Sequence, residues 1–315
     1  SFSERDVLVV WGSKSRRRIE DVIKGDPKIL TVEDGFIRSY GLGADFVPPM
    51  SLVFDSRGIY YDPSKESDLE HILNYYPFSK KELEEAEEIR RSIVEKEITK
   101  YNLISERKLK VNTWKKVILV VGQVEDDEAL LLGGGSIRTN IQLLRRVREL
   151  NPDDHIIFKP HPDVLSKNRG SFDLSLVKKL ADSVETEADI ISCIKVAGEV
   201  HVLSSLSGFE ALIREKKVFV YGAPFYAGWG LTQDHMTLPR RKRRLTLQEL
   251  IAGTLLVYPV YYDWTLKGFV DCKTVINRIL YERSKNKKHI KTDLPKPIKK
   301  MLNYIGFIKW KLSMQ

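Results

Sequence analysis

The chain has 315 residues, two cysteines and a formal net charge of +9 at pH 7. Two cysteines provide neither a disulfide framework nor the ligand spacing of a zinc site, and they fit a reducing compartment. No stretch reaches the ~18 apolar residues of a transmembrane helix, and no signal-peptide pattern begins the sequence. The length exceeds the ~100–200 residues typical of one domain, so two lobes are expected.

The positive charge is concentrated at the C-terminal end. Ten basic residues and one acid lie between Arg283 and Gln315, so residues 1–282 are formally neutral. This distribution disfavours a nucleic-acid-binding face across the whole fold and favours a local anionic partner for the tail.

The first lobe begins with apolar runs that predict strands. A buried strand is expected at 6–12, followed by helical character over 15–24 and by further strands at 29–32 and 51–55. Residues 57–62 are typical of a turn with a short strand, and 102–114 of a connection between lobes. Helices are expected at Ser67–Tyr75 and Ser79–Lys100, because each opens with a serine followed three residues later by a glutamate.

The strand at 29–32 runs into polar residues beside glycines. Glu33, Asp34 and Arg38 follow it directly, with Gly41 and Gly43 close behind. The pattern fits either a site at a strand end or a polar turn.

The second lobe alternates strands with helices, which indicates a parallel, doubly wound sheet. We therefore predict an α/β, GT-B-like fold: two Rossmann-type lobes with a cleft between them, plus a basic C-terminal helical tail. The expected boundaries are 1–112 for an acceptor-side lobe, 113–265 for a nucleotide-binding lobe, and 266–315 for C-terminal helices and the tail. The strands of the second lobe are expected at 117–121, 155–158, 200–203 and 218–221, and its helices at 136–150, 174–181, 190–196, 208–215 and 245–256.

Lys159 and His161 stand where the strand at 155–158 must end, because the flanking prolines cannot continue a ladder of hydrogen bonds. Ligands of open α/β sheets bind beyond the carboxyl ends of strands, so His161 is a candidate anion ligand. A capped core histidine is the simpler alternative for a histidine considered alone.

A serine-rich stretch follows the strand at 200–203. Ser204, Ser205 and Ser207 precede Gly208 and Glu210 at a predicted helix start. Free N–H groups and the helix dipole make such a start an anion site, although a plain N-cap needs only one serine. Together with Lys159 and His161, the stretch predicts a nucleotide-phosphate pocket without a metal.

Four consecutive acids follow the strand at 117–121, after Gly122, Gln123 and Val124. One carboxylate of Glu125–Glu128 could act as nucleophile or general base, the cluster could hold a divalent cation, or the acids could simply begin a helix. The following Gly133–Gly135 lacks the lysine of a P-loop, which excludes a Walker-type site.

Aromatic residues alternate with glycines over 221–232, including Tyr226 and Trp229. Glycines permit close backbone approach and aromatic faces suit a base or sugar ring, whereas a packed surface loop is the alternative. The run Arg240–Arg244 then either meets an anionic ligand or is an ordinary solvated run, which we favour.

The tail carries an apolar helical stripe with lysines mostly elsewhere, which is typical of a helix at an anionic membrane surface. A terminal helix docked on the first lobe is the alternative. The stripe comprises Ile298, Met301, Leu302, Ile305, Ile308 and Leu312.

Several long stretches of the sequence resemble the bacterial capsule-polysaccharide β-Kdo glycosyltransferases of the KpsC type. They occur in family order over most of residues 8–265, whereas the lysine-rich end has no match in the family pattern. Because KpsC-type proteins usually carry two modules, the chain resembles the second module, either of a pair or as a single-module relative. The stretches are VEDGFIRSYGLG (32–43), SLVFDSRGIYYD (51–62), VGQVEDDEAL (121–130), FKPHPDV (158–164), SLSGFEAL (205–212) and YGAPFYAGWGLTQD (221–234).

The resemblance implies transfer of Kdo from CMP-β-Kdo with retention, by double displacement and without a metal or other cofactor. The acceptor would be an oligo-Kdo lysophospholipid at the inner face of the cytoplasmic membrane, and other capsule-assembly enzymes would be further partners. Asp127 would be the nucleophile with Asp126 in reserve, and Glu33 would face it as acid/base or acceptor ligand. His161 and the serine-rich helix start would hold the CMP phosphate, with Lys159 and Glu210 among the donor-binding residues. The candidates for sugar or acceptor contacts are Asp34, Arg38, Gln123, Tyr226 and Trp229.

Two other functions remain open from the residues. One is a GT-B transferase or epimerase that uses a UDP-sugar, and the other is a non-catalytic module that binds nucleotide or glycolipid.

Overall fold

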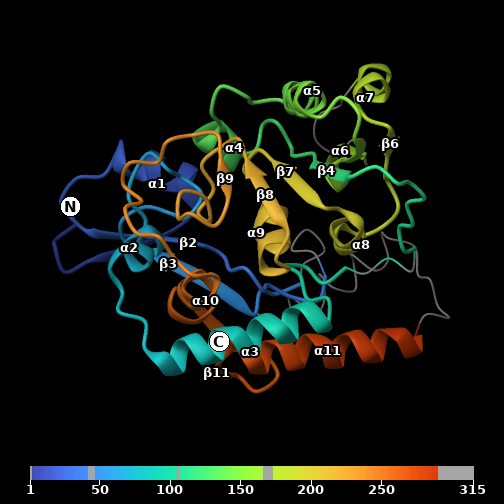
Figure 1. Cartoon of the computed structure of the whole chain (residues 1–315). Helices are drawn as coiled ribbons and strands as arrows, with labels where there is room; N and C mark the ends of the chain where they lie inside the picture. The colour runs from blue at the N-terminus through green and yellow to red at the C-terminus, as the bar shows by residue number, and fades with distance from the viewer. Residues whose placement is uncertain (1, 42–46, 104, 106, 166–172, 290–315) are drawn as a thin grey trace. The chain divides into compact units, whose positions relative to one another are not determined.

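The computed structural model describes the chain except for residues 1, 42–46, 104, 106, 166–172 and 290–315 (Figure 1). The apolar stripe and most of the basic tail fall outside the described residues. Two compact units are formed, and neither is continuous in sequence. Unit 1 comprises residues 1–54, 80–103 and 254–315, and unit 2 comprises residues 55–79 and 104–253.

Unit 1 is built on a five-stranded sheet, counted over the described residues, in the order β1-β2-β3-β10-β11. β1 pairs with β2 in parallel, whereas β10 is antiparallel to both β3 and β11. The helices of this unit are α1 (Gly12–Glu20), α3 (Lys80–Glu95) and α11 (Cys272–His289); the strands are β1 (Val7–Trp11), β2 (Lys28–Asp34), β3 (Ser51–Asp55, whose last residue groups with unit 2), β10 (Pro259–Asp263) and β11 (Gly268–Val270).

The first strand differs from the prediction. β1 is an edge strand rather than a buried one, and Val7, Val9 and Trp11 are each more than half exposed. Within the described part of the chain β1 pairs with β2 alone, and the face that carries Val7, Val9 and Trp11 is largely open, which a run of five residues does not reveal.

Unit 2 contains a parallel sheet in the order β6-β5-β4-β7-β8-β9, six strands among the described residues. The predicted parallel α/β sheet is thus confirmed for this unit. The strands are β4 (Val117–Val121), β5 (His155–Lys159), β6 (Ser183–Val184), β7 (Glu199–Val202), β8 (Lys217–Val220) and β9 (Gln233–Asp234). The helices are α2 (Asp68–Tyr75), α4 (Glu128–Gly133), α5 (Asn140–Leu150), α6 (Pro162–Leu165), α7 (Leu174–Leu180), α8 (Ile190–Val196), α9 (Leu206–Ile213) and α10 (Leu247–Ala252), which continues as a π-helix (Gly253–Val257) whose residues after Gly253 group with unit 1.

Side chains from both faces of the central strands are buried, as a sheet covered by helices on both sides requires. On one face, Ile118 and Val120 of β4 join a core cluster with residues of α5 and α7. Leu119, between them, points to the opposite face and is fully buried. The hydrophobic run of β4 is therefore explained by two covered faces.

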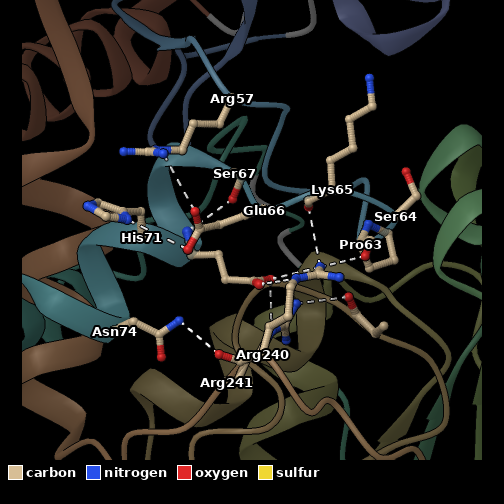
Figure 2. A network of polar contacts seen from close by, with 12 residues as sticks. Arg57, Pro63, Ser64, Lys65, Glu66, Ser67, His71, Asn74, Arg240 and Arg241 are labelled. Atoms are coloured by element: carbon tan, nitrogen blue, oxygen red, sulfur yellow. Dashed lines mark hydrogen bonds and ion pairs between the residues drawn. The ribbon is translucent and has the colours of Figure 1, made fainter.

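Residues 55–79 belong to unit 2 because α2 is tied to the chain around Arg240. Ser67 caps α2 as predicted, its Oγ accepting from the Glu70 N–H at 3.0 Å. Arg240 donates to the Glu70 carboxylate at 2.6 Å, and Asn74 donates to the Arg240 carbonyl at 3.0 Å (Figure 2). The sequence predicts a single boundary at residue 112, whereas each unit of the structure is made of separate segments of the chain.

Other local differences follow from hydrogen bonds made by single side chains. Residues 57–62 form turns without a strand, because the Asp55 carboxylate accepts from the N–H groups of Arg57 and Gly58. α5 begins at Asn140 rather than at Ser136, because Thr139 and Gln142 form a capping box. Within the described residues, no helix is both long and apolar enough to cross a bilayer.

Candidate functional site

The carboxyl ends of β5, β4 and β7 lie side by side along one side of the unit 2 sheet, because β4 pairs in parallel with both β5 and β7. The chain places β5 and β6 on one side of β4, and β7, β8 and β9 on the other. Such a reversal of strand order is where open parallel sheets bind ligands. Three of the sequence-predicted motifs follow these three strands, so the structure brings them together.

Gln123 and Ser204 connect the ends of β4 and β7 directly. The Gln123 amide nitrogen donates to Ser204 Oγ at 3.0 Å, and its oxygen accepts from the Ser204 N–H at 3.2 Å. Asn140 fixes the backbone of Gln123 from the other side, with two hydrogen bonds of 2.9 Å. Both side chains of the bridge are buried, so Gln123 organises the two loops and its amide is already engaged.

The serine-rich stretch is the N-terminus of α9. Ser205 is the N-cap, and its Oγ accepts from the Ser207 N–H at 3.2 Å. Ser204 is engaged by Gln123, whereas Ser207 and Glu210 are half-buried in the first turns. The N-cap alternative thus accounts for Ser205 alone.

Gly208 is buried against Tyr226. A Cβ at this position would lie 2.2 Å from the Tyr226 hydroxyl oxygen, closer than any real contact. The hydroxyl donates to the Ser205 carbonyl at 2.5 Å. Glycine is therefore required here for close packing of α9 against this ring.

Lys159 ends β5 with only 9% of its surface exposed. Burial lowers the pKa of its ammonium, and the nearby Cys193, Glu185 and Asp189 partly offset that effect. Among the described residues, no hydrogen bond or ion pair is made by its side-chain nitrogen. A buried cation of this kind at a sheet edge is suited to an anionic ligand. His161, two residues on, is half-buried, and its carbonyl accepts from the Val164 N–H at 3.1 Å in the turn that starts α6.

The acidic cluster divides into separate roles. Glu125 accepts from the Asn140 N–H at 2.8 Å and so supports the start of α5. Asp126 is exposed, and Asp127 occupies the N-cap position of α4. Its carboxylate makes no capping hydrogen bond to α4, so the helix-start interpretation does not account for its side chain. Across the described residues, no three His, Cys, Asp or Glu side chains are grouped so as to hold a metal ion.

Glu33, Asp34 and Arg38 belong to unit 1, where Glu33 and Asp34 end β2 and Arg38 follows it. The Arg38 guanidinium pairs with Asp34 at 2.7 Å and donates to Ser39 Oγ at 2.9 Å. Glu33 accepts from the N–H of Asp34 at 3.0 Å. Arg38 is buried, so this cluster has the internal order of a polar turn, and the pairing of Glu33 with Asp127 stays a prediction.

Tyr226 and Trp229 are fully buried, which leaves no ring face for a sugar or an acceptor. The Trp229 indole donates to the Phe225 carbonyl at 2.8 Å, and the Tyr226 ring packs on Phe209 and Phe225. The expectation that these rings contact a ligand is corrected: aromatic residues among glycines form a packed loop here.

The expectation of a solvated run over 240–244 is also wrong for one residue. Arg241 is 9% exposed and donates to the carbonyls of Pro224 and Ala227. Its partner Glu70 was not expected at any site, because the two residues are 171 positions apart. Asn140 was missed as well, although the Thr139–Gln142 capping box beside it marks a helix start.

The chain is similar to a known protein family and to several known proteins. Residues 6–105 and 78–261 match the family described as capsule polysaccharide biosynthesis proteins. Two LipA capsule polysaccharide modification proteins of Neisseria meningitidis are 42% and 43% identical over 283 residues, covering 90% of this chain and 40% of each relative. The lipopolysaccharide-processing protein LpsZ of Rhizobium meliloti is 37% identical, over 88% of this chain and 64% of its own length.

Two solved structures are also similar. The β-Kdo 2,7 transferase of Thermosulfurimonas dismutans KpsC shares 39% identity at a TM-score of 0.75, over 88% of this chain and 85% of its own. The β-Kdo 2,4 transferase of the same KpsC shares 31% identity at a TM-score of 0.76, over 86% of each chain. The chain thus spans about 40% of the length of the LipA proteins that it matches, and it belongs to the capsule polysaccharide biosynthesis protein family, with the fold of the KpsC β-Kdo transferases.

Proposed function

We propose that this chain is a retaining β-Kdo glycosyltransferase with a GT-B-like fold. It transfers Kdo from CMP-β-Kdo to a Kdo-containing lipid in the synthesis of a capsule linker. The observation that carries the proposal is the meeting of three family-like motifs at the β5-β4-β7 edge, in a chain 39% identical to a β-Kdo 2,7 transferase. The higher identity to the 2,7 enzyme than to the 2,4 enzyme favours a 2,7 linkage.

In the proposed reaction, the Asp127 carboxylate attacks the anomeric carbon of Kdo while the bond to the CMP phosphate breaks. An acceptor hydroxyl then attacks the same carbon, the bond to Asp127 breaks, and Glu33 takes the hydroxyl proton. Two inversions give net retention. Asp127 is chosen for this role by its place in the family-like stretch 121–130, and the exposed Asp126 is the reserve.

The CMP phosphate is assigned to Lys159, His161 and the first turn of α9. Lys159 supplies a buried positive charge, and the α9 start supplies N–H donors and the positive end of a helix dipole. No metal or other cofactor is part of the proposal. Residues 290–315 are proposed to hold the protein at the anionic inner surface of the cytoplasmic membrane, where its lipid acceptor and other capsule-assembly enzymes lie.

The deciding experiment is incubation of the purified chain with CMP-β-Kdo and a synthetic Kdo acceptor, followed by NMR of the product linkage. A β-linked Kdo product supports the proposal, and a 2,4 linkage rejects the assignment of linkage alone. No product, together with tight binding of UDP rather than CMP, favours a UDP-sugar enzyme. CMP binding without any product favours a non-catalytic binding module.

The membrane assignment is tested separately with the variant that lacks residues 290–315, which leaves α11 complete. We expect loss of binding to vesicles rich in phosphatidylglycerol, with unchanged turnover on a soluble acceptor. Vesicle binding equal to that of the full chain rejects the assignment.

A further inference from the structure

The buried ring of Tyr226 supports the start of α9. The loop that carries this ring is in turn bound by Arg241, which pairs with Glu70 on α2. All the groups involved lie in unit 2. Tyr226 is 0% exposed, and its hydroxyl donates to the carbonyl of the N-cap Ser205 at 2.5 Å. The same hydroxyl fills the space where a Cβ of residue 208 would be. One phenol therefore fixes two backbone positions in the first turn of α9.

Hydrogen bonds from Arg241 hold the loop that carries Tyr226. This guanidinium donates to the carbonyls of Pro224 at 2.5 Å and Ala227 at 2.6 Å, which flank the tyrosine on both sides. Its carbon lies 5.7 Å from the centre of the Trp229 ring. Because a guanidinium has five donors in a rigid fork, one side chain can bind several carbonyls of a loop at fixed angles.

Glu70 on α2 balances the charge of this buried cation. Its carboxylate lies 3.4 Å from Arg241 Nε and 2.6 Å from Arg240 Nε. Glu70 and Arg241 are both nearly inaccessible, whereas the side chain of Arg240 is 45% exposed. Figure 2 shows Arg240 and Asn74 joined beside this pair, at the point where α2 meets the chain leading into Arg241.

A buried ion pair of this kind adds little net stability, because desolvation of the two charges offsets their attraction. What it does provide is fixed geometry. A hydrophobic pair of equal volume would fill the same space, but it could not hold two carbonyl groups in set directions. The arrangement therefore suits a role in orientation.

We propose that Glu70 and Arg241 are positioning residues for the donor: they hold loop 223–229 so that Tyr226 sets the orientation of the anion-binding first turn of α9. The inference rests on the proposed assignment of the CMP phosphate to this turn. Neither residue touches the donor. Their effect is transmitted through Tyr226 to the N–H groups that follow Ser205.

The test compares Arg241→Lys, Tyr226→Phe and the double variant with Arg243→Lys as the matched control. Arg243 lies in the same basic run and pairs with Glu249 and the Tyr76 carbonyl, not with loop 223–229. Tyr226→Phe keeps the ring and removes only the hydroxyl. The measurements are the dissociation constant of CMP by calorimetry, and KM and kcat for CMP-β-Kdo.

We expect Arg241→Lys and Tyr226→Phe each to weaken CMP binding about tenfold and to raise the donor KM by a similar factor. The double variant should be no weaker than the worse single variant, since both act through one contact. The acceptor KM, and CMP binding by Arg243→Lys, should stay within about twofold. Glu70→Gln should reproduce Arg241→Lys, and Glu70→Asp should restore part of the affinity.

Wild-type CMP affinity in folded Arg241→Lys would overturn the inference, and so would additive effects in the double variant. Hydrogen exchange keeps the test independent of the donor assignment. In the ligand-free protein, both single variants should speed exchange at the amides of residues 206–209, and Arg243→Lys should not. If the wild-type chain fails to bind CMP, the proposed function fails, and the exchange rates still decide whether Arg241 positions α9.

Discussion

Replacing Gly208 by alanine tests the packing at the start of α9. The new methyl carbon would lie 2.2 Å from the Tyr226 hydroxyl oxygen and 2.7 Å from the adjacent ring carbon. Both atoms belong to a fully buried side chain that cannot swing into solvent. The ring or the helix must therefore move.

The magnitude follows from three contributions. Overpacking a buried site costs about 1–3 kcal/mol, and displacement of the hydroxyl from the Ser205 carbonyl costs about 1 kcal/mol more. Alanine recovers up to about 1 kcal/mol through its higher helix propensity. We expect a net loss of about 2 kcal/mol in the free energy of unfolding, measured by urea denaturation as a lower midpoint at unchanged slope.

Two further variants test whether the loss of stability comes from the contact with the Tyr226 ring. Gly198→Ala is the matched control, because a Cβ there would meet its nearest neighbour at an ordinary 3.6 Å, and its stability should change by less than about 1 kcal/mol. In a Tyr226→Phe background the atom at 2.2 Å is gone, so the cost of Gly208→Ala should fall by about 1 kcal/mol. If Gly208→Ala is as stable as the wild type, the ring is not fixed as described.

Asp127→Asn should lower kcat on the order of 10³-fold without changing CMP affinity, whereas Asp126→Asn should keep most of the activity. The reverse result would assign the nucleophile to Asp126. Lys159→Met should raise the donor KM about tenfold or more. Its stability should change little, because burial already lowers the pKa of this ammonium and penalises its charge. An unchanged KM would exclude Lys159 from the donor site. Burial lowers the pKa of His201 from 6.5 to about 4, so as the pH falls from 6.5 to 4 the unfolded chain binds a proton that the folded chain rejects. The wild type should therefore lose up to about 3 kcal/mol more than His201→Phe over this window in urea titrations at several pH values, and identical pH slopes would contradict it.

Strand ends were the most predictable part of the site. Apolar runs that stop at Gly122, Pro160 and Ser204 place polar residues at carboxyl ends of strands, and the parallel order then gathers them at one edge. The sequence also predicted the cap of α2 at Ser67, because the capping pattern is local.

Burial of polar and aromatic residues was the least predictable part. A loop with Tyr226 and Trp229 among glycines has the same composition whether its rings face a ligand or the core. Arg241 occurs within five consecutive basic residues, and nothing local distinguishes it from exposed neighbours. Its partner Glu70 lies in a helix on the far side of a long stretch of chain, so only the fold reveals the pair. The β10–β11 hairpin was not predicted, because the sequence pattern indicates no strand at 259–263 and helices after residue 265.

Each unit is made of segments that are far apart in the sequence: residues 55–79 belong to unit 2, and residues 254–289 belong to unit 1. This limits how the protein can be cut or recombined. The chain passes from one unit to the other after residues 54, 79, 103 and 253. A fragment ending near residue 103 would carry Glu70 without the arginines that it binds, and the complementary fragment would leave the buried Arg241 guanidinium without its carboxylate partner. A chimera that exchanges only unit 2 with a related transferase must therefore transplant two segments at once, and a protease cut between residues 79 and 104 should leave the two products associated.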